Sequence, residues 1–167
     1  PGEEIIANVD RAVVIEFIVP CVDILDKAGI ASFWDPKKVS SVITLQYPAP
    51  DPSVAELHKK MRKIATEKNL SCFYGHAGIV NQVVVEKGDI LPGQLIVGTD
   101  SHSTTYGVMG AAGTGLGITD MAQVLATGQT WFRVPESIRF TLTGRTQPGV
   151  MSKDVILYLI GKYGSDF

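Results

Sequence analysis

Hydrophobic positions recur at two spacings along the chain, and these spacings predict strands and helices in alternation. Runs rich in Val and Ile predict strands over residues 5–9, 12–19, 39–44, 83–85 and 94–97. An alternating stretch predicts a half-exposed strand over 139–143. Apolar residues three and four positions apart predict helices over 20–28, 54–68, 119–127 and 152–163. Strands and helices in this order indicate an α/β layer fold.

The helix expected over 54–68 has the clearest pattern. Its apolar stripe consists of Val54, Leu57, Met61, Ile64 and Ala65. Ser53 and Glu56 have the spacing of a capping box, and His58 falls on the side expected to face solvent. The Lys and Arg residues of this helix are expected to form a solvated face rather than a phosphate site, because acids elsewhere balance them.

The last two expected helices differ in how they begin and in what they bury. Thr119 or Asp120 is placed to cap the helix over 119–127. The helix over 152–163 is expected to bury a stripe of Val155, Ile156, Leu159 and Ile160.

Composition excludes several classes of protein. The 167 residues suit one domain or slightly more, and 45% hydrophobic with 19% charged residues excludes a disordered, charge-rich chain. A net charge of −2 gives no attraction to nucleic acid or to an anionic membrane. No apolar run reaches the ~18 residues of a membrane-spanning helix; Glu16 interrupts the longest patch.

The two cysteines indicate the redox environment of the protein, and the first residues indicate whether the chain is processed or part of a larger protein. Cys21 and Cys72 cannot form a disulfide scaffold or supply the thiolates of an iron–sulfur cluster, so reduced thiols in a cytoplasmic protein are expected. The chain begins with Pro1 rather than Met, and it has no signal-peptide pattern. We expect a trimmed product or a piece of a larger protein.

The segment from Val97 to Gly107 carries the most distinctive chemistry. An apolar strand leads directly into Asp100, Ser101 and His102, and ligands of open α/β sheets bind beyond the carboxyl ends of strands. Asp can hold a base, Ser can hydrogen-bond a carboxylate, and His can move protons near neutral pH. The alternative is a turn in which the Asp and Ser side chains only cap the backbone.

Other candidate sites have weaker signals. The glycines between Gly107 and Gly117 do not form a dinucleotide fingerprint or a P-loop, so they favour tight turns and close packing. His58 and His76 have no partner at metal-ligand spacing, so no metal site is predicted from them.

Several motifs together resemble a known family. They are the segment LPGQLIVGTDSHSTTYG over 91–107 and the shorter motifs Trp34-Asp35-Pro36, Thr119-Asp120-Met121, Ala126-Thr127-Gly128, Val134-Pro135-Glu136 and SKDVILY over 152–158. They resemble the aconitase superfamily, and within it the group of 3-isopropylmalate dehydratase and homoaconitase large subunits. The likeness runs through nearly the whole chain, so residues 1–167 are identified as one partial aconitase-like N-terminal region.

The resemblance implies a three-layer α/β/α fold and a dehydration–rehydration of a hydroxy di- or tricarboxylic acid, which belongs to leucine biosynthesis in the isopropylmalate branch. It also implies a 4Fe-4S cluster that acts as a Lewis acid. In the family the cluster cysteines lie C-terminal to the region covered here, so no metal ligand is assigned in this chain. The implied partners are a cluster-bearing remainder and a small subunit that carries the swivel domain.

The resemblance also assigns roles to residues. Asp100 and His102 are the expected catalytic residues, while the substrate-binding residues are Ser101, Asn81, Gln82 and Thr104. Other family signatures are altered: an early His-Asp pair corresponds to Ile15-Glu16, an Asp-His pair to Thr44-Leu45, and a His to Asn81. Each lost acid–base group costs ~10²–10⁴-fold in rate, so little isomerase activity is expected of this chain alone.

Three hypotheses remain open from the sequence. The chain is part of an isopropylmalate- or homoaconitate-type dehydratase, cut down or split into pieces. Alternatively, it is a divergent paralogue that is inactive or repurposed as a ligand-binding module. The third hypothesis is a structural subunit whose exposed apolar face mediates association.

Overall fold

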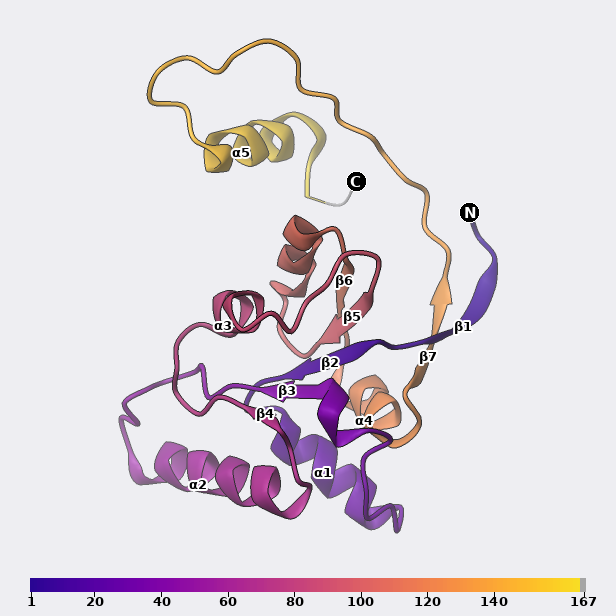
Figure 1. Cartoon of the computed structure of the whole chain (residues 1–167), viewed down its shortest axis with the longest axis vertical. Coiled ribbons are helices and arrows are strands. Elements are labelled where there is room, and N and C mark those ends of the chain that lie inside the picture. Colours follow the sequence, from indigo (N-terminus) through magenta and orange to yellow (C-terminus); the bar gives the residue numbers. More distant parts are fainter. Residues whose placement is uncertain (166–167) are drawn as a thin grey trace. The chain divides into compact units, whose positions relative to one another are not determined.

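The computed structural model describes residues 1–165, and these form two compact units. One unit consists of Ile5–Phe132, and the other joins the first four residues to the segment from Arg133 onward. Figure 1 shows the order of the helices and strands along the chain.

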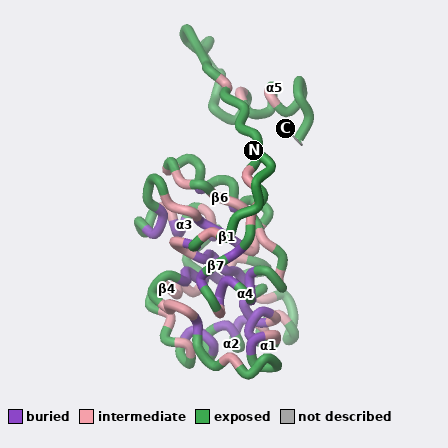
Figure 2. Tube along the Cα trace, turned by 90° about the vertical axis from the view of Figure 1, so that its right-hand side faces the viewer, coloured by how far each residue is buried: buried purple, intermediate pink, exposed green. Residues whose placement is uncertain are grey.

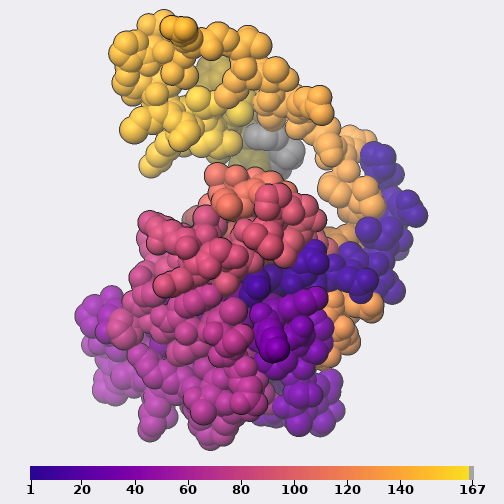
Figure 3. All heavy atoms as spheres, viewed as in Figure 1, coloured from indigo at the N-terminus to yellow at the C-terminus, as the bar shows by residue number. Residues whose placement is uncertain are grey.

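Five parallel strands form the sheet of the larger unit, in the order β4-β3-β2-β5-β6. Their bounds are β2 (Arg11–Val14), β3 (Val39–Ser41), β4 (Cys72–Phe73), β5 (Leu95–Gly98) and β6 (Ala112–Gly115). Ala12 pairs with Val39 on one side and with Val97 on the other, so β2 and β5 are neighbours at the centre. Figure 3 shows indigo and purple atoms from the start of the chain packed against magenta and red atoms from its middle.

Helices cover both faces of this sheet, which confirms the expected α/β fold. One hydrophobic cluster unites Ala12, Val14 and Val97 with residues of α1 (Ile18–Lys27), α2 (Pro52–Glu67) and α4 (Ile118–Thr127). The other unites Val13 and Ile96 with residues of α3 (Val80–Glu86) and the 3-10 helix η2 (Ser103–Met109). Alternate residues of a strand point to opposite faces, so each central strand serves both clusters. The buried residues gather around the sheet in Figure 2.

Two stretches of β-branched residues form helices instead of the expected strands. The strand expected over 12–19 ends at Val14, and α1 begins at Ile18. The strand expected over 83–85 is part of α3, in which Val80, Val83 and Val84 are buried. Spacings of three and four place these valines on one helical face, and burial of that face outweighs their preference for strands.

The residues that cap the helices α2 and α4 also differ from those expected from the sequence. Asp51 caps α2, because its Oδ1 accepts hydrogen bonds from the backbone N–H of Ser53 at 2.8 Å and of Val54 at 3.1 Å. The Ser53 capping box is therefore wrong. Gly117 precedes α4 without a side-chain cap, so the expected role of Thr119 or Asp120 is wrong too.

The position of His58 was also predicted wrongly. It is 5% exposed rather than solvated, because its ring turns toward the loop after β3.

The smaller unit contains the helix α5 (Ser152–Tyr163), as expected, but its predicted core stripe is wrong. Val155 and Leu159 are half-buried, and Ile156 and Ile160 are exposed. The strand expected over 139–143 is also wrong, since these residues belong to neither a helix nor a strand.

The remaining elements are β1 (Glu4–Asn8) and β7 (Gln129–Arg133), which form a two-stranded sheet, and the 3-10 helix η1 (Pro36–Lys38). Among the described residues, no helix combines the length and apolar character needed to cross a membrane.

Candidate functional site

The strand order places a topological switch point where the chain changes direction across the sheet. The connections from β2 run outward to β3 and β4, whereas β5 and β6 extend the sheet on the other side of β2. Ligands of open α/β sheets bind at such a switch point, beyond the carboxyl ends of the two central strands. Glu16 follows β2, and Asp100 follows β5. Thr99 joins the two strand ends, because the Ile15 N–H donates to its Oγ1 at 3.1 Å.

Asp100 is the centre of the polar residues at this edge. The amide Nδ2 of Asn81 on α3 donates to its Oδ2 at 3.0 Å. Nδ1 of His102 lies 3.2 Å from its Oδ1, and the Ser101 Oγ lies 3.1 Å from the same nitrogen. Four residues expected in the site from two parts of the sequence are therefore linked. The His102 side chain is 75% exposed, so its ring is accessible to a ligand.

Glycines on β5 and β6 fix this turn. The hydroxyl of Ser103 donates to the Asp100 carbonyl at 2.6 Å. A Cβ on Gly98 would lie 2.1 Å from the Ser103 Oγ, and a Cβ on Gly113 would lie 2.5 Å from the Ser103 carbonyl oxygen. Real Cβ atoms do not approach so closely, so only glycine lets the turn pack onto the strands. The expectation of close packing for the later glycines is confirmed at Gly113.

The hydrogen bonds around Asp100 set its ionisation. Partial burial acts to raise its pKa, but the hydrogen bonds from Asn81 and His102 and the charge of His102 together lower it. The net result is an Asp100 pKa below its usual value, so this residue is a carboxylate at neutral pH. Burial, followed by the charge of Asp100, raises the pKa of Tyr106.

Glu16 binds the loop after β3, a role that nothing in the sequence indicates beyond one charge in an apolar run. Its Oε1 accepts the backbone N–H groups of Thr44 at 2.8 Å and Leu45 at 2.7 Å. The Thr44 hydroxyl in turn donates to the Gly78 carbonyl at 3.0 Å and accepts the Val80 N–H at 2.8 Å. These contacts connect β2, β3 and the start of α3, so they hold Asn81 beside Asp100.

Polar atoms without partners mark the same edge. Among the described residues, the Asn81 Oδ1 and the hydroxyl of Tyr106 are buried with no hydrogen-bond partner. Tyr106 is fully buried in η2, and it was not predicted as a site residue. Buried polar groups are nearly always satisfied, so these two atoms are exceptions to the usual pattern.

Among the described residues, the other two expected substrate-binding residues, Gln82 and Thr104, have no hydrogen bond to the Asp100 side chain. Gln82 shares with Asn81 a groove of about 380 Å³ between α3 and η2, and its Nε2 donates to the Glu86 Oε1 at 2.7 Å. Thr104 is exposed, and Thr105 rather than Thr104 lines this groove.

The chain's cysteines do not fit an iron–sulfur cluster. Cys21 lies within α1 with no exposed surface, and burial raises the pKa of its thiol to about 12. Cys72 lies on β4, where its Sγ is 3.7 Å from Nη1 of Arg11. Within residues 1–165, no three His, Cys, Asp or Glu side chains gather where they could hold a metal ion.

Comparison with known proteins gives the lineage. The model of the aconitase family (aconitate hydratase) matches residues 27–167. The chain belongs to the aconitase family. This confirms the resemblance drawn from the motifs around Asp100.

The similar proteins are considerably longer than this chain. Large subunit 1 of 3-isopropylmalate dehydratase from Methanopyrus kandleri is 44% identical over 167 residues, which cover 99% of this chain and 40% of that protein. The large subunit from Aquifex aeolicus is 42% identical over 168 residues, 99% of this chain and 39% of that protein. A probable methanogen homoaconitase large subunit from Methanothermobacter thermautotrophicus is 44% identical over 172 residues, with 99% and 40% covered. The chain thus spans about two fifths of these relatives.

Proposed function

We propose that this member of the aconitase family is the N-terminal part of a hydro-lyase that moves a hydroxyl group by dehydration and rehydration. Its substrate is a hydroxy di- or tricarboxylic acid of the 3-isopropylmalate or homoaconitate type. The observation that carries the proposal is the Asp100–His102 turn at the switch point, held by Asn81. The relatives with which the chain aligns are named 3-isopropylmalate dehydratase and homoaconitase large subunits.

Each residue has a role that suits its surroundings. Asp100 orients His102, whose exposed ring binds or moves the proton of the reacting hydroxyl. The Ser101 hydroxyl donates to a substrate carboxylate. Asn81 fixes Asp100 through its side-chain amide. Gln82 and Thr104 contact more distant substrate groups.

Other parts of the enzyme complete this site. A 4Fe-4S cluster supplies Lewis acidity when bound, and its ligands come from outside the residues described here. The names of the relatives specify large subunits, so we propose a small subunit as partner. The chain's own contribution is then to orient the hydroxy-acid and to hold one proton-transfer group.

A second function is favoured by the residues at three positions where the family signatures are altered. Thr44, Leu45 and Asn81 cannot exchange a proton near neutral pH, and Thr44 and Asn81 make well-formed hydrogen bonds. A repurposed site would keep the geometry for binding a hydroxy-acid without turning it over. In that function the chain is a ligand-binding or subunit-interaction module.

Kinetics on the complete assembly distinguish the two functions. We expect the enzyme with its cluster and small subunit to hydrate or dehydrate 3-isopropylmalate or a homologue, followed by absorbance of the unsaturated acid. His102→Asn should lower kcat by at least about 100-fold. His76→Asn, in an exposed loop, should leave kcat unchanged.

Two other outcomes of these experiments would support the second function or exclude both functions. Binding of the acids without turnover, with some turnover gained in Asn81→His, supports the repurposed function. If calorimetry detects no binding of any hydroxy-acid, both functions are wrong.

A further inference from the structure

The smaller unit carries an unusual share of exposed apolar surface. It holds fewer than a quarter of the described residues, yet it has half of the large hydrophobic side chains that are exposed in them. None of its described residues is buried, and in Figure 2 α5 and the chain before it are green and pink. Exposed apolar surface concentrated in this way marks an interaction site. The exposed residues are Ile138, Leu142, Val150, Met151, Ile156, Leu157, Tyr158, Ile160 and Tyr163.

Apolar residues surround the helix α5 instead of forming a single stripe. Val155, Leu159 and Tyr163 recur at a spacing of four, whereas Leu157 and Tyr158 lie on other sides of the helix and are 53% and 67% exposed. A helix that is apolar on most of its sides is typical of the interior of a larger protein. An isolated helix as short as the 12 residues of α5 is also marginal in water, so α5 needs a surface to pack against.

The segment before α5 has the alternation of a half-exposed strand. Ile138, Phe140 and Leu142 alternate with polar residues, and Ile138 and Leu142 are 59% and 70% exposed. The ring of Phe140 packs against that of Tyr163 on α5, with 5.4 Å between the ring centroids, so Phe140 points toward the helix. Residues 138–143 belong to neither a helix nor a strand in this chain. A strand is stable only within a sheet, so this segment needs strands beside it.

The order of these two elements indicates what kind of surface they fit. A strand followed by a covering helix is the repeating unit of α/β layer folds, and the larger unit shows this order in β2 and α1. Residues 138–143 and α5 follow the same order, but none of the strands described in this chain pairs with them. They therefore fit the open edge of a β-sheet and the apolar face beside that edge.

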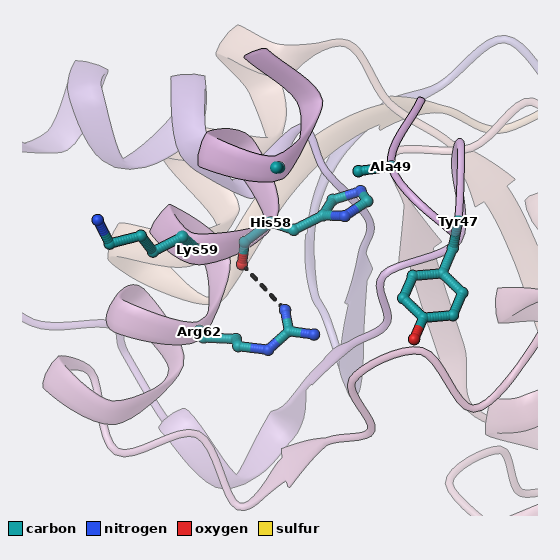
Figure 4. A pocket seen from close by; sticks show the side chains of 6 residues that line it. Tyr47, Ala49, His58, Lys59 and Arg62 are labelled. Atoms are coloured by element: carbon teal, nitrogen blue, oxygen red, sulfur yellow. Dashed lines mark hydrogen bonds between the residues drawn. The ribbon is translucent and has the colours of Figure 1, made fainter. Parts of the chain in front are cut away.

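The hollows beside α2, in contrast, are accounted for within the larger unit. A cavity of about 270 Å³ is lined by Glu16 and Leu45, two positions of the altered family signatures, so it belongs to the site already described. Arg62 lines a second hollow of about 310 Å³ (Figure 4). Its Nη1 donates to the His58 carbonyl at 3.3 Å, and its Nη2 lies 3.4 Å from Nδ1 of His76. The guanidinium group thus has partners in this chain, and the hollow gives no sign of a missing one.

A second copy of this chain offers no suitable sheet edge. The sheet of the larger unit ends in β4, which has only two residues, and in β6, whose four residues are Ala, Gly, Thr and Gly. Neither edge has the length or the large apolar side chains to match residues 138–143. The relatives, however, contain more protein than this chain, which covers 40% of the large subunit from Methanopyrus kandleri. The aconitase family model matches through residue 167, so the smaller unit belongs to the matched region.

We infer that residues 138–143 and α5 dock on a β-sheet in the remaining part of a longer large subunit. Residues 138–143 add a strand to the edge of that sheet, where backbone hydrogen bonds hold it. The helix α5 covers the apolar face of the same sheet and buries Ile156, Leu157 and Ile160. This docking rests on the proposal that the chain is part of a longer large subunit, but it does not depend on the reaction that the subunit catalyses.

Hydrogen–deuterium exchange on the full chain and on the complete large subunit tests this docking. In the chain alone, the amides of residues 138–143 should exchange at rates close to those of an unstructured peptide. In the complete subunit, these amides and those of α5 should exchange at least 100-fold more slowly. The helix α4 contributes buried residues to the core of the larger unit, so its amides should be protected in both samples and provide the control.

Substitutions on α5 show whether its apolar residues make the contact. Ile160→Asp should reduce the protection of residues 138–143 in the complete subunit at least tenfold. It should leave the unfolding midpoint of the chain alone unchanged, because Ile160 is exposed there. Gly161→Asp introduces the same residue on another side of the helix, where an added Cβ meets no atom within 4 Å, and it should preserve the protection. Protected amides in α4 show that each variant is folded.

The docking is wrong if residues 138–143 and α5 stay unprotected in the complete subunit, or if Ile160→Asp keeps the full protection. It is also wrong if protection appears in the chain alone as its concentration rises, because a second copy then covers α5. Protection that appears only after the small subunit is added contradicts it as well. Protection in an assembly that turns over no hydroxy-acid supports the docking and counts against the hydro-lyase reaction alone.

Discussion

Asp100 depends on two residues that approach it from different directions. Asn81 reaches it from α3, and His102 from the turn that follows β5. Both stabilise the carboxylate relative to the carboxylic acid, which is why the Asp100 pKa is lowered despite partial burial. The stabilisation exists only while Asp100 is ionised, so it makes stability depend on pH.

Replacing Asp100 by Asn should remove this pH dependence. Because the folded pKa lies below the unfolded value, the ionised group contributes stability above the unfolded pKa, and this is lost as pH falls through the folded pKa. Wild type should exceed Asp100→Asn by about 1 kcal/mol at pH 7, a typical value for one hydrogen bond. The difference should vanish in strong acid, as measured by urea unfolding at a series of pH values.

An exposed carboxylate provides the control for that series. Asp23 lies on the solvent side of α1, and Asp23→Asn should follow the wild-type pH profile. If Asp100→Asn keeps the full acid dependence of the wild type, the hydrogen bonds of Asp100 do not stabilise its charged form.

At the scale of elements, the site depends on how closely η2 approaches the edge of the sheet. β6 lies against the start of η2, and the glycine at position 113 leaves no side chain between them. Asp100 and Ser103 form the turn at this contact. A change on β6 should therefore reach the site through the backbone.

Gly113→Ala should displace this turn. Its Cβ would lie 2.5 Å from a backbone oxygen, which cannot move like the end of a flexible side chain. Such overpacking costs about 1–3 kcal/mol in urea unfolding. The amide resonance of the Asn81 side chain should also shift in NMR spectra, because its bond to Asp100 lengthens.

Gly107→Ala is the matched substitution within the same region. No atom lies within 4 Å of the Cβ it would add, so the midpoint of unfolding should change little. Equal effects of the two substitutions would contradict the assignment of Gly113 as the close contact.

At the scale of the whole chain, the apolar core belongs to one unit. The buried hydrophobic residues run from Val9 to Leu125, and all lie within Ile5–Phe132. In contrast, α5 contributes no buried residue among those described. The core is also what holds the edge of the sheet that carries Asp100.

A chain ending at Val134 should therefore fold as stably as the longer one. It keeps the backbone hydrogen bonds of Val134 with Gly2 and Glu3, and it loses no buried hydrophobic residue. Urea unfolding should give the same free energy to within about 0.5 kcal/mol, the range typical of changes away from a core. Loss of the cooperative transition in the shortened chain would show that later residues belong to the core.

Much of the architecture followed from local pattern. The β-branched runs in β2, β3 and β5 and the apolar stripe of α2 were predicted at the correct places, although β2 and β3 were expected to be longer. The Asp100 turn was also predicted, because a strand that leads directly into polar residues is visible in a single segment. The motifs around that turn, together with those along nearly the whole chain, indicated the aconitase family.

Other features came only from the fold. The valines of α3 and the start of α1 have strand-like composition, and their helices follow from the surface they bury. Likewise, the contacts of two buried side chains join residues that are far apart in the sequence. His58 lies against the carbonyl of Leu45, 13 positions away, and Glu16 accepts from Thr44 and Leu45, 28 and 29 positions away.

The sequence by itself determined the type of fold, the lineage and the turn that carries Asp100. The tertiary structure alone decided that Glu16 binds the loop after β3, that its other oxygen is buried without a partner among the described residues, and that a cavity opens beside it. The physical reason is that periodicity records which residues prefer burial, whereas the partner of a buried polar group depends on which distant backbone the packed core brings next to it.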